Sequence, residues 1–213
     1  MSEQVVKKNI LDVSVIAILR GVEKNFFKDI VQASFSVGLQ AIEVTMNTRG
    51  VEEILKESVQ MAPQGMLIGA GTVCSKGEAE KAIGSGAMFL VTPNFNKEVI
   101  EYGTAQKVPV VSGSLTPTEV YNSWQAGASM IKVFPCSAMG GPQYIRELLG
   151  PYDTLPLVAV GGVNNENMHE YFQAGVQAVG VSTALFGKEA LAEKNINELT
   201  KNVKDFIGSI PKG

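Results

Sequence analysis

The sequence is poor in the side chains that build metal centres, disulfides and nucleic-acid surfaces. Its 213 residues include one histidine, His169, which argues against a histidine-based metal centre. The two cysteines, Cys74 and Cys136, lie far apart and fit neither a CxxC nor a zinc-binding pattern. We interpret them as reduced thiols of a cytoplasmic protein. The formal net charge is −3 and no basic run is present, which argues against a nucleic-acid partner.

Long apolar runs are missing as well. No stretch of about 18 apolar residues is present, so we expect no membrane span. The first residues do not read as a charged segment followed by an apolar one, so we expect no signal peptide. The chain does have a 45% hydrophobic fraction, which is enough for a sizeable core. We expect one domain over residues 1–213, with no linker.

Apolar, strand-like runs alternate with helical patterns along the chain. We expect strands at residues 15–19, 41–46, 66–68, 89–91, 108–111, 129–135, 157–160 and 178–181. We expect helices at residues 26–37, 51–61, 78–83, 97–105, 117–126, 143–149, 164–173 and 196–210, and a short leading helix at 3–11. Thr116, Pro117 and Glu119 predict a capping box with proline at the first helical position. Eight such units predict a single (β/α)8 TIM barrel, and a doubly wound open sheet is the alternative.

A lysine stands in the middle of the sixth apolar run. Because side chains alternate along a strand, Met130, Lys132 and Phe134 share one face. If that face is interior, desolvation favours the neutral amine of Lys132, which is the form that attacks a carbonyl. The alternative is a lysine at an exposed strand end, with its head in water.

A carboxylate occupies a similar place in the second run. Glu43 lies among apolar residues and could simply form a structural ion pair, for example with Arg20. If Glu43 and Lys132 face the same barrel interior, the two groups tune each other's protonation. The pair would then consist of an amine nucleophile and a proton carrier.

Polar and special residues follow the strands at the end where such barrels place their active sites. They are Arg20, Thr72, Pro93, Ser112, Gly161, Gly162 and Ser182. The loops after the seventh and eighth strands of these barrels frequently bind phosphate. Glycines let backbone N–H groups approach an anion, although turns need glycine for other reasons.

Five sequence blocks together resemble the KDPG/KHG aldolase family, whose members split 2-keto-3-deoxy-6-phospho sugar acids. The likeness covers nearly the whole chain, and the blocks are Ile42-Glu43-Val44-Thr45, Gly69-Ala70-Gly71-Thr72-Val73, Val91-Thr92-Pro93-Asn94, Ile131-Lys132-Val133-Phe134-Pro135 and Val160-Gly161-Gly162-Val163. The combination is specific, although each block alone is not.

The resemblance implies a class I aldolase in which Lys132 forms a Schiff base and Glu43 acts as acid and base, partly through a bound water. It implies no metal, no cofactor other than the covalent imine on Lys132, and a homotrimer. The other implied positions are a carboxylate ligand (Thr72), an anion-binding arginine (Arg20), two pocket walls (Pro93 and Phe134) and a phosphate end (Gly161, Gly162 and Ser182).

The sequence departs from the family pattern close to Glu43. Members that act on the gluconate substrate often carry an arginine four residues after the glutamate, where this chain has Asn47. Arg49 is a candidate replacement. We predict that Asn47 is a substrate-binding residue. Asn47 resembles the residue of the 6-phosphogalactonate branch at this position. Val160 does so as well, where gluconate enzymes commonly have threonine. Thr45, where that branch tends to have proline, does not fit it.

The resemblance therefore implies cleavage of 2-dehydro-3-deoxy-6-phosphogluconate to pyruvate and glyceraldehyde 3-phosphate, with action on 4-hydroxy-2-oxoglutarate. The galactonate epimer is the alternative substrate. Three readings of other kinds stay open: a phosphate-binding isomerase or epimerase, a sugar-phosphate sensor without turnover, and a metal-dependent aldolase. Only the Schiff-base enzyme requires Lys132 as a nucleophile.

Overall fold

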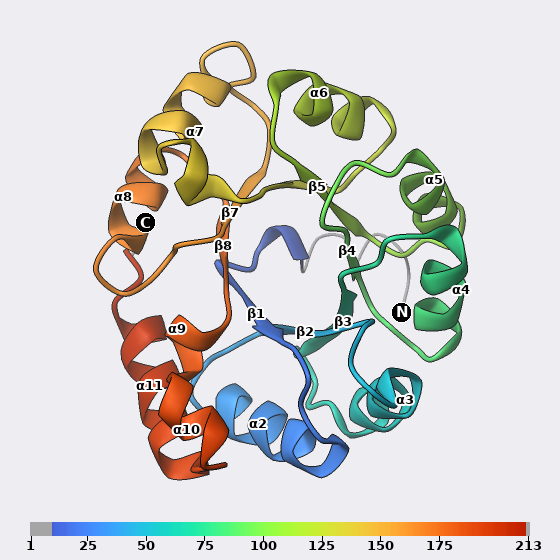
Figure 1. Ribbon diagram of the computed structural model, residues 1–213, viewed down its shortest axis with the longest axis vertical. Helices are drawn as coiled ribbons and strands as arrows, with labels where there is room; N and C mark the ends of the chain where they lie inside the picture. Colours follow the sequence, from blue (N-terminus) through green and yellow to red (C-terminus); the bar gives the residue numbers. More distant parts are fainter. Residues whose placement is uncertain (1–9, 212–213) are drawn as a thin grey trace.

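The computed structural model describes residues 10–211. Within this range, eight parallel strands pair in chain order and β8 closes onto β1 (Figure 1). The strands are β1 Val15–Leu19, β2 Ala41–Thr45, β3 Leu67–Gly71, β4 Leu90–Val91, β5 Val110–Ser114, β6 Met130–Val133, β7 Leu157–Val160 and β8 Ala178–Val181. The predicted TIM barrel is confirmed. The predicted leading helix at 3–11 lies outside the described residues, apart from its last two positions.

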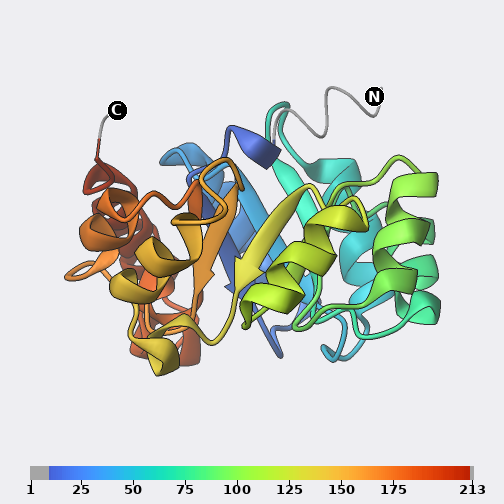
Figure 2. The same cartoon turned by 90° about the horizontal axis from the view of Figure 1, so that it is seen from above.

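Helices cover the outside of the barrel (Figures 1 and 2). They are α2 Lys24–Ser36, α3 Val51–Met61, α4 Lys76–Gly84, α5 Lys97–Ala105, α6 Pro117–Gln125, α7 Pro142–Leu149, α8 Met168–Gln173, α9 Thr183–Phe186, α10 Lys188–Ala192 and α11 Ile196–Gly208, with a 3-10 helix, η1, at Cys136–Met139. None of the helices in the described range is long and apolar enough for a membrane crossing. In Figure 2 the strand arrows point to one edge of the barrel, so Figure 1 looks onto the face where the strands end.

Strand alternation divides the core into two layers. Ile16, Met130 and Val158 belong to a buried cluster inside the barrel. Ile131 and Val133 belong to the larger cluster between the strands and the helices. Because the strands are buried on both faces, they read as nearly continuous apolar runs, and a charged residue on an inward position is conspicuous.

The helix predicted before β8 begins later than expected. We predicted it at 164–173, but α8 starts at Met168. Asn164 Oδ1 accepts from the N–H groups of Glu166 (2.9 Å) and Asn167 (3.1 Å), and Asn167 Oδ1 accepts from Asn164 N–H (2.9 Å). These side-chain bonds to the backbone stabilise a turn in place of the first helical turn.

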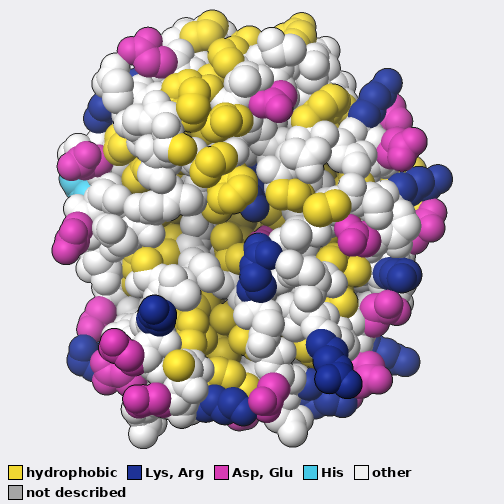
Figure 3. Space-filling view, in the orientation of Figure 1, with side chains coloured by type: hydrophobic (Ala, Val, Ile, Leu, Met, Phe, Trp, Pro, Cys, Tyr) yellow, Lys and Arg dark blue, Asp and Glu magenta, His cyan; other side chains and the backbone are white. Residues whose placement is uncertain are grey.

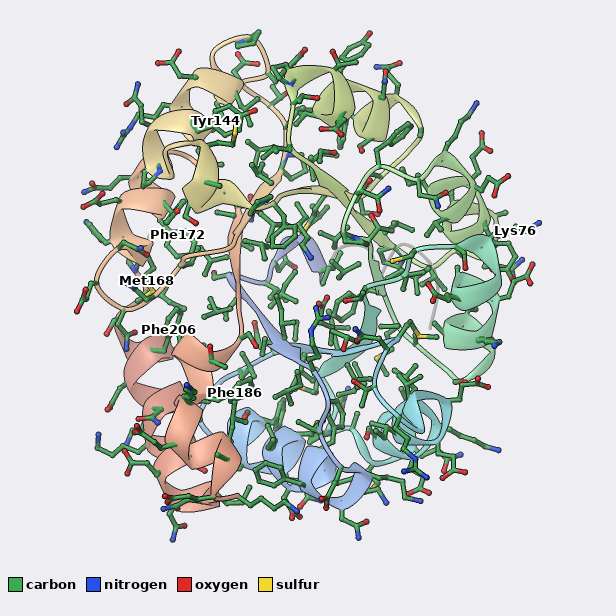
Figure 4. All side chains as sticks on the ribbon, viewed as in Figure 1. Lys76, Tyr144, Met168, Phe172, Phe186 and Phe206 are labelled. Carbon is green, nitrogen blue, oxygen red and sulfur yellow. The ribbon has the colours of Figure 1, made fainter. Side chains whose placement is uncertain are left out.

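Two short helices between β8 and α11 were not predicted. Gly187, in the left-handed region at φ 85°, separates α9 from α10. Phe186 at the end of α9 and Phe206 on α11 are fully buried, and both are labelled in Figure 4. Asn202 Nδ2 on α11 also donates to the Phe186 carbonyl at 3.0 Å. Packing against α11 therefore fixes α9, and with it the residues that follow β8.

Candidate active site

A cavity of about 600 Å³ opens at the end of the barrel where the strands finish. This volume suits a small organic ligand. Figure 3 shows this face, with basic side chains near its centre beside a hollow. All the predicted site residues except Asn47 line the cavity: Arg20, Glu43, Thr72, Pro93, Lys132, Phe134, Gly161, Gly162 and Ser182. The closed barrel thus brings together residues that lie far apart in the sequence.

Lys132 projects from β6 into this cavity and is 6% exposed. Burial lowers the pKa of its ammonium below the ordinary 10.5; the charge of Glu43 acts against this, and that of Arg20 adds to it. The Lys132 Nζ atom lies 5.0 Å from the centroid of the Phe134 ring, at the mouth of the cavity. The structure therefore presents a buried amine that loses its proton more readily than an exposed lysine, and the neutral amine is the nucleophilic form.

Glu43 reaches the same cavity from β2 and is 1% exposed. Burial raises the pKa of its carboxyl from 4.5 to about 7, against the opposing effects of Lys132 and Arg20. Its Oε2 atom has no hydrogen-bond partner among the described residues. Buried polar atoms are normally paired, so this oxygen is free for a water molecule or a substrate group. A carboxyl that titrates near neutrality suits proton transfer in both directions.

The neighbouring strand makes room for this carboxylate. A Cβ atom at Gly71, on β3, would overlap Glu43 Oε1. Only glycine therefore allows Glu43 its position, and this explains a glycine inside a strand.

Thr72 and Arg20 meet at one side of the cavity. Thr72 has φ 55°, a left-handed conformation that is rare for a β-branched residue. Such strain is commonly stored at functional sites. Arg20 Nη2 donates to Thr72 Oγ1 at 3.4 Å. Arg20 and Lys132 are the only basic side chains among the cavity-lining residues that the structure describes.

Pro93 forms a wall of the cavity through a close approach between β4 and β5. Thr92 Oγ1 donates to the Asn94 carbonyl at 2.8 Å and accepts from Gly113 N–H at 2.9 Å. A Cβ atom at Gly113 would overlap the backbone of Pro93. The Thr92 hydroxyl and the missing side chain at Gly113 therefore fix the position of Pro93.

The loops after β7 and β8 form a further part of the cavity wall. Gly161 and Gly162 have φ 96° and 78°, and a side chain at Gly162 would overlap Ser137 of η1. Ser182 precedes α9, whose first residues also line the cavity. Loops after the seventh and eighth strands, together with a short extra helix, are the recurrent phosphate site of these barrels.

Asn47 and Arg49 do not join the other site residues. Both are exposed in the turn between β2 and α3, and neither lines the cavity. The predicted placement of Asn47 beside the other substrate-binding residues is therefore not seen. Strand β2 ends two residues after Glu43, and the chain turns there. Asn47 therefore does not share the inward direction that the strand gives to Glu43.

Sequence reasoning did not single out part of the cavity wall. The additional lining residues are Ile18, Val163, Asn164, Gly180, Val181, Thr183 and Ala184. Ile18 and Gly180 are inward positions of β1 and β8, which strand alternation could have identified. Asn164, Thr183 and Ala184 depend on the turn before α8 and on α9, and neither was predicted.

Comparison with known proteins finds similar chains over most of this sequence. A family model described as KDPG and KHG aldolase matches residues 6–202. A probable 2-dehydro-3-deoxy-6-phosphogalactonate aldolase of Rhizobium meliloti is 36% identical over 173 residues, which is 80% of this chain and 81% of that protein. The 2-dehydro-3-deoxy-6-phosphogalactonate aldolase of Escherichia coli is 33% identical over 193 residues, or 90% of this chain and 93% of that protein.

A solved structure with the same fold contains a trapped intermediate. It is the KDPG aldolase of Legionella pneumophila, with pyruvate captured at low pH as a covalent carbinolamine. The TM-score is 0.86 at 25% identity, and the match covers 93% of this chain and 96% of that one.

Proposed function

The chain belongs to the KDPG and KHG aldolase family, and from this premise we propose that it is a class I aldolase acting on a 6-phosphorylated 2-keto-3-deoxy acid. Family membership makes it a carbon–carbon lyase and sets aside the isomerase and sensor alternatives. The observation that carries the proposal is the buried amine of Lys132, which shares one cavity with the buried carboxyl of Glu43.

The proposed reaction starts at the neutral amine of Lys132. The amine attacks the C2 ketone, and Glu43 transfers the protons that allow water to leave. The resulting iminium draws electrons from the C3–C4 bond, which breaks as the C4 hydroxyl loses its proton. The aldehyde departs, and the remaining enamine is protonated at C3. Hydrolysis of the imine then releases pyruvate and restores the amine.

Substrate orientation follows from the two ends of the cavity. We place the pyruvyl carboxylate beside Thr72 and Arg20. The Arg20 guanidinium supplies a positive charge there, whereas Asn47, at the position where gluconate enzymes often carry an arginine, is uncharged. The phosphate then lies at Gly161, Gly162 and Ser182. Pro93 and Phe134 enclose the reacting part of the substrate.

Two observations bear on the substrate epimer. The family resemblance implied the gluconate epimer first, whereas the two relatives at 36% and 33% identity are named as galactonate enzymes. Val160 lines the cavity, at the position where gluconate enzymes commonly carry threonine. We therefore propose the galactonate epimer as the preferred substrate, with the gluconate epimer and 4-hydroxy-2-oxoglutarate as weaker ones.

A pyruvate-release assay with these three substrates tests the proposal. We expect release from all three, fastest from the galactonate epimer. Val160→Thr adds a hydroxyl to the cavity wall, and we expect it to shift the kcat/KM ratio of the epimers toward gluconate by roughly tenfold. Val59→Thr, on the outer helix α3 and outside the cavity lining, is the matched control and should leave the ratio unchanged. Lack of pyruvate from every substrate would refute the proposed function, and an unchanged ratio in Val160→Thr would refute its role in epimer choice.

We also propose that the protein forms the homotrimer that its resemblance to the family implies. Tyr121 and Trp124 on α6 are 49% and 39% exposed, and Met139 on η1 is 44% exposed. Figure 3 shows hydrophobic side chains gathered over the α6 and α7 side of the viewed face. Exposed apolar surface of this kind commonly marks an interface.

Light scattering on a sizing column should give the mass of three chains. Trp124→Glu places a charge on this surface and should shift the protein toward the monomer. A monomeric wild-type protein at micromolar concentration would contradict the trimer.

A further inference from the structure

Two buried hydroxyl groups lie under the exposed loop that carries Arg20. Thr45 at the end of β2 and Thr48 in the turn that follows are 0% and 4% exposed. Their Oγ1 atoms are 3.1 Å apart, and Thr48 Oγ1 accepts from Gly21 N–H at 3.0 Å. A side-chain bond thus joins the turn after β2 to the loop after β1.

The turn that contains Thr48 does not need this hydroxyl for its own structure. Thr48 N–H donates to the Thr45 carbonyl at 2.9 Å, and the Thr48 carbonyl accepts from Val51 N–H at 3.2 Å. Both backbone groups of Thr48 are therefore paired within the segment. The hydroxyl is the group that reaches out of the turn, and its partner is the residue next to Arg20.

The Arg20 side chain needs such an anchor because its loop is exposed. Gly21 has φ 66°, and a Cβ atom there would meet no other atom within 4 Å, so packing does not fix this backbone. The described partner of the guanidinium is Thr72 Oγ1, at 3.4 Å. Held at Gly21, the loop keeps the Arg20 guanidinium beside Thr72, where the proposed function places the substrate carboxylate.

We propose that Thr48, supported by Thr45, is a positioning residue that holds the Arg20 loop in place to bind the substrate carboxylate. This inference rests on the proposed function, because Arg20 has a carboxylate to bind only if the cavity takes a keto acid. Thr48 itself does not line the cavity, so it acts through Arg20.

The test uses pyruvate and borohydride, which convert an imine into a stable adduct that intact mass reveals. Thr48→Val keeps the side-chain shape and removes the hydroxyl. We expect the half-saturating pyruvate concentration to rise about fivefold to tenfold, in line with the loss of one hydrogen bond, while the maximum adduct level stays unchanged. Thr48→Ser keeps the hydroxyl and should restore wild-type saturation. Thermal unfolding of both variants identifies general destabilisation.

A double-mutant cycle with Arg20→Gln separates positioning from a purely structural role. If Thr48 acts through Arg20, Thr48→Val should change half-saturation by less than twofold in the Arg20→Gln background. Equal effects in both backgrounds, or wild-type saturation in Thr48→Val, would overturn the inference and leave the proposed function standing. A wild-type protein that forms no adduct at any pyruvate concentration would overturn both.

Discussion

Replacing Lys132 with methionine should abolish the pyruvyl adduct and lower aldol cleavage by at least about 10⁴-fold, the scale expected for loss of a covalent nucleophile. Methionine fills a similar volume in the strand but has no amine. Without the iminium, nothing in the cavity can accept the electrons of the C3–C4 bond. Intact mass after treatment with pyruvate and borohydride measures the first effect, and pyruvate release measures the second.

Lys76→Met is the matched control. Lys76 lies on α4 at the outer edge of the molecule in Figure 4, and its side chain is 53% exposed. Its ion pair with Glu80 is exposed and contributes little. This variant should keep both the adduct and the activity. An adduct that persists in Lys132→Met would place the nucleophile elsewhere and withdraw its assigned role.

The Lys132→Met substitution should not reduce the thermal stability of the protein. Burying the Lys132 ammonium is energetically unfavourable, and this is why burial lowers its pKa. Methionine removes the polar head and keeps the apolar contacts of the side chain. An equal or higher unfolding temperature, together with lost activity, would show that Lys132 serves chemistry rather than folding.

Replacing Glu43 with glutamine should lower kcat by about 10²- to 10⁴-fold, the usual contribution of a positioned acid–base group. Glutamine keeps the shape beside Gly71 but cannot transfer a proton. In the wild type we expect an inflection of the rate near pH 7, where the Glu43 carboxyl titrates. That inflection should be missing in Glu43→Gln, and a profile with the same inflection would assign it to another group.

Stability supplies an independent readout of the Glu43 pKa. Its pKa of about 7 in the folded protein lies above the ordinary 4.5, so the folded state holds the proton more tightly than the unfolded state. The favourable contribution is present below pH 4.5 and is lost as pH rises through 7. The loss amounts to about 3 kcal/mol.

Denaturant unfolding at pH 5 and pH 8 checks this linkage. Glu43→Gln has no carboxyl to titrate, so its stability relative to wild type should increase between the two pH values. A constant difference between variant and wild type would mean that Glu43 has an ordinary pKa.

Several features followed from local sequence. Alternation along the sixth strand placed Lys132 on the face opposite Ile131, and the structure shows that separation. The capping box at Thr116 and Glu119 is also present, with Pro117 at the first helical position. Each depends on neighbours within a few residues, where side-chain period and backbone hydrogen bonding leave few alternatives.

Other features depended on contacts between distant segments. Strand β5 was predicted at 108–111 and is found at Val110–Ser114, because pairing with β6 extends it past the apolar run to Ser114. The turn before α8 and the position of α9 depend on side-chain bonds and on packing against α11. Hydrophobic periodicity along the sequence does not reveal such contacts.

The amino-acid sequence by itself determined the alternation of strands and helices, the strand face that Lys132 shares with Met130 and Phe134, and the resemblance to the family. Only the tertiary structure decided that Lys132 and Glu43 point inward and share a cavity, that Asn47 stays outside it, and that Thr48 is bonded to the loop of Arg20. The physical reason is barrel closure. Strand pairing fixes each side chain's direction locally, but the loops after different strands meet only when β8 pairs with β1.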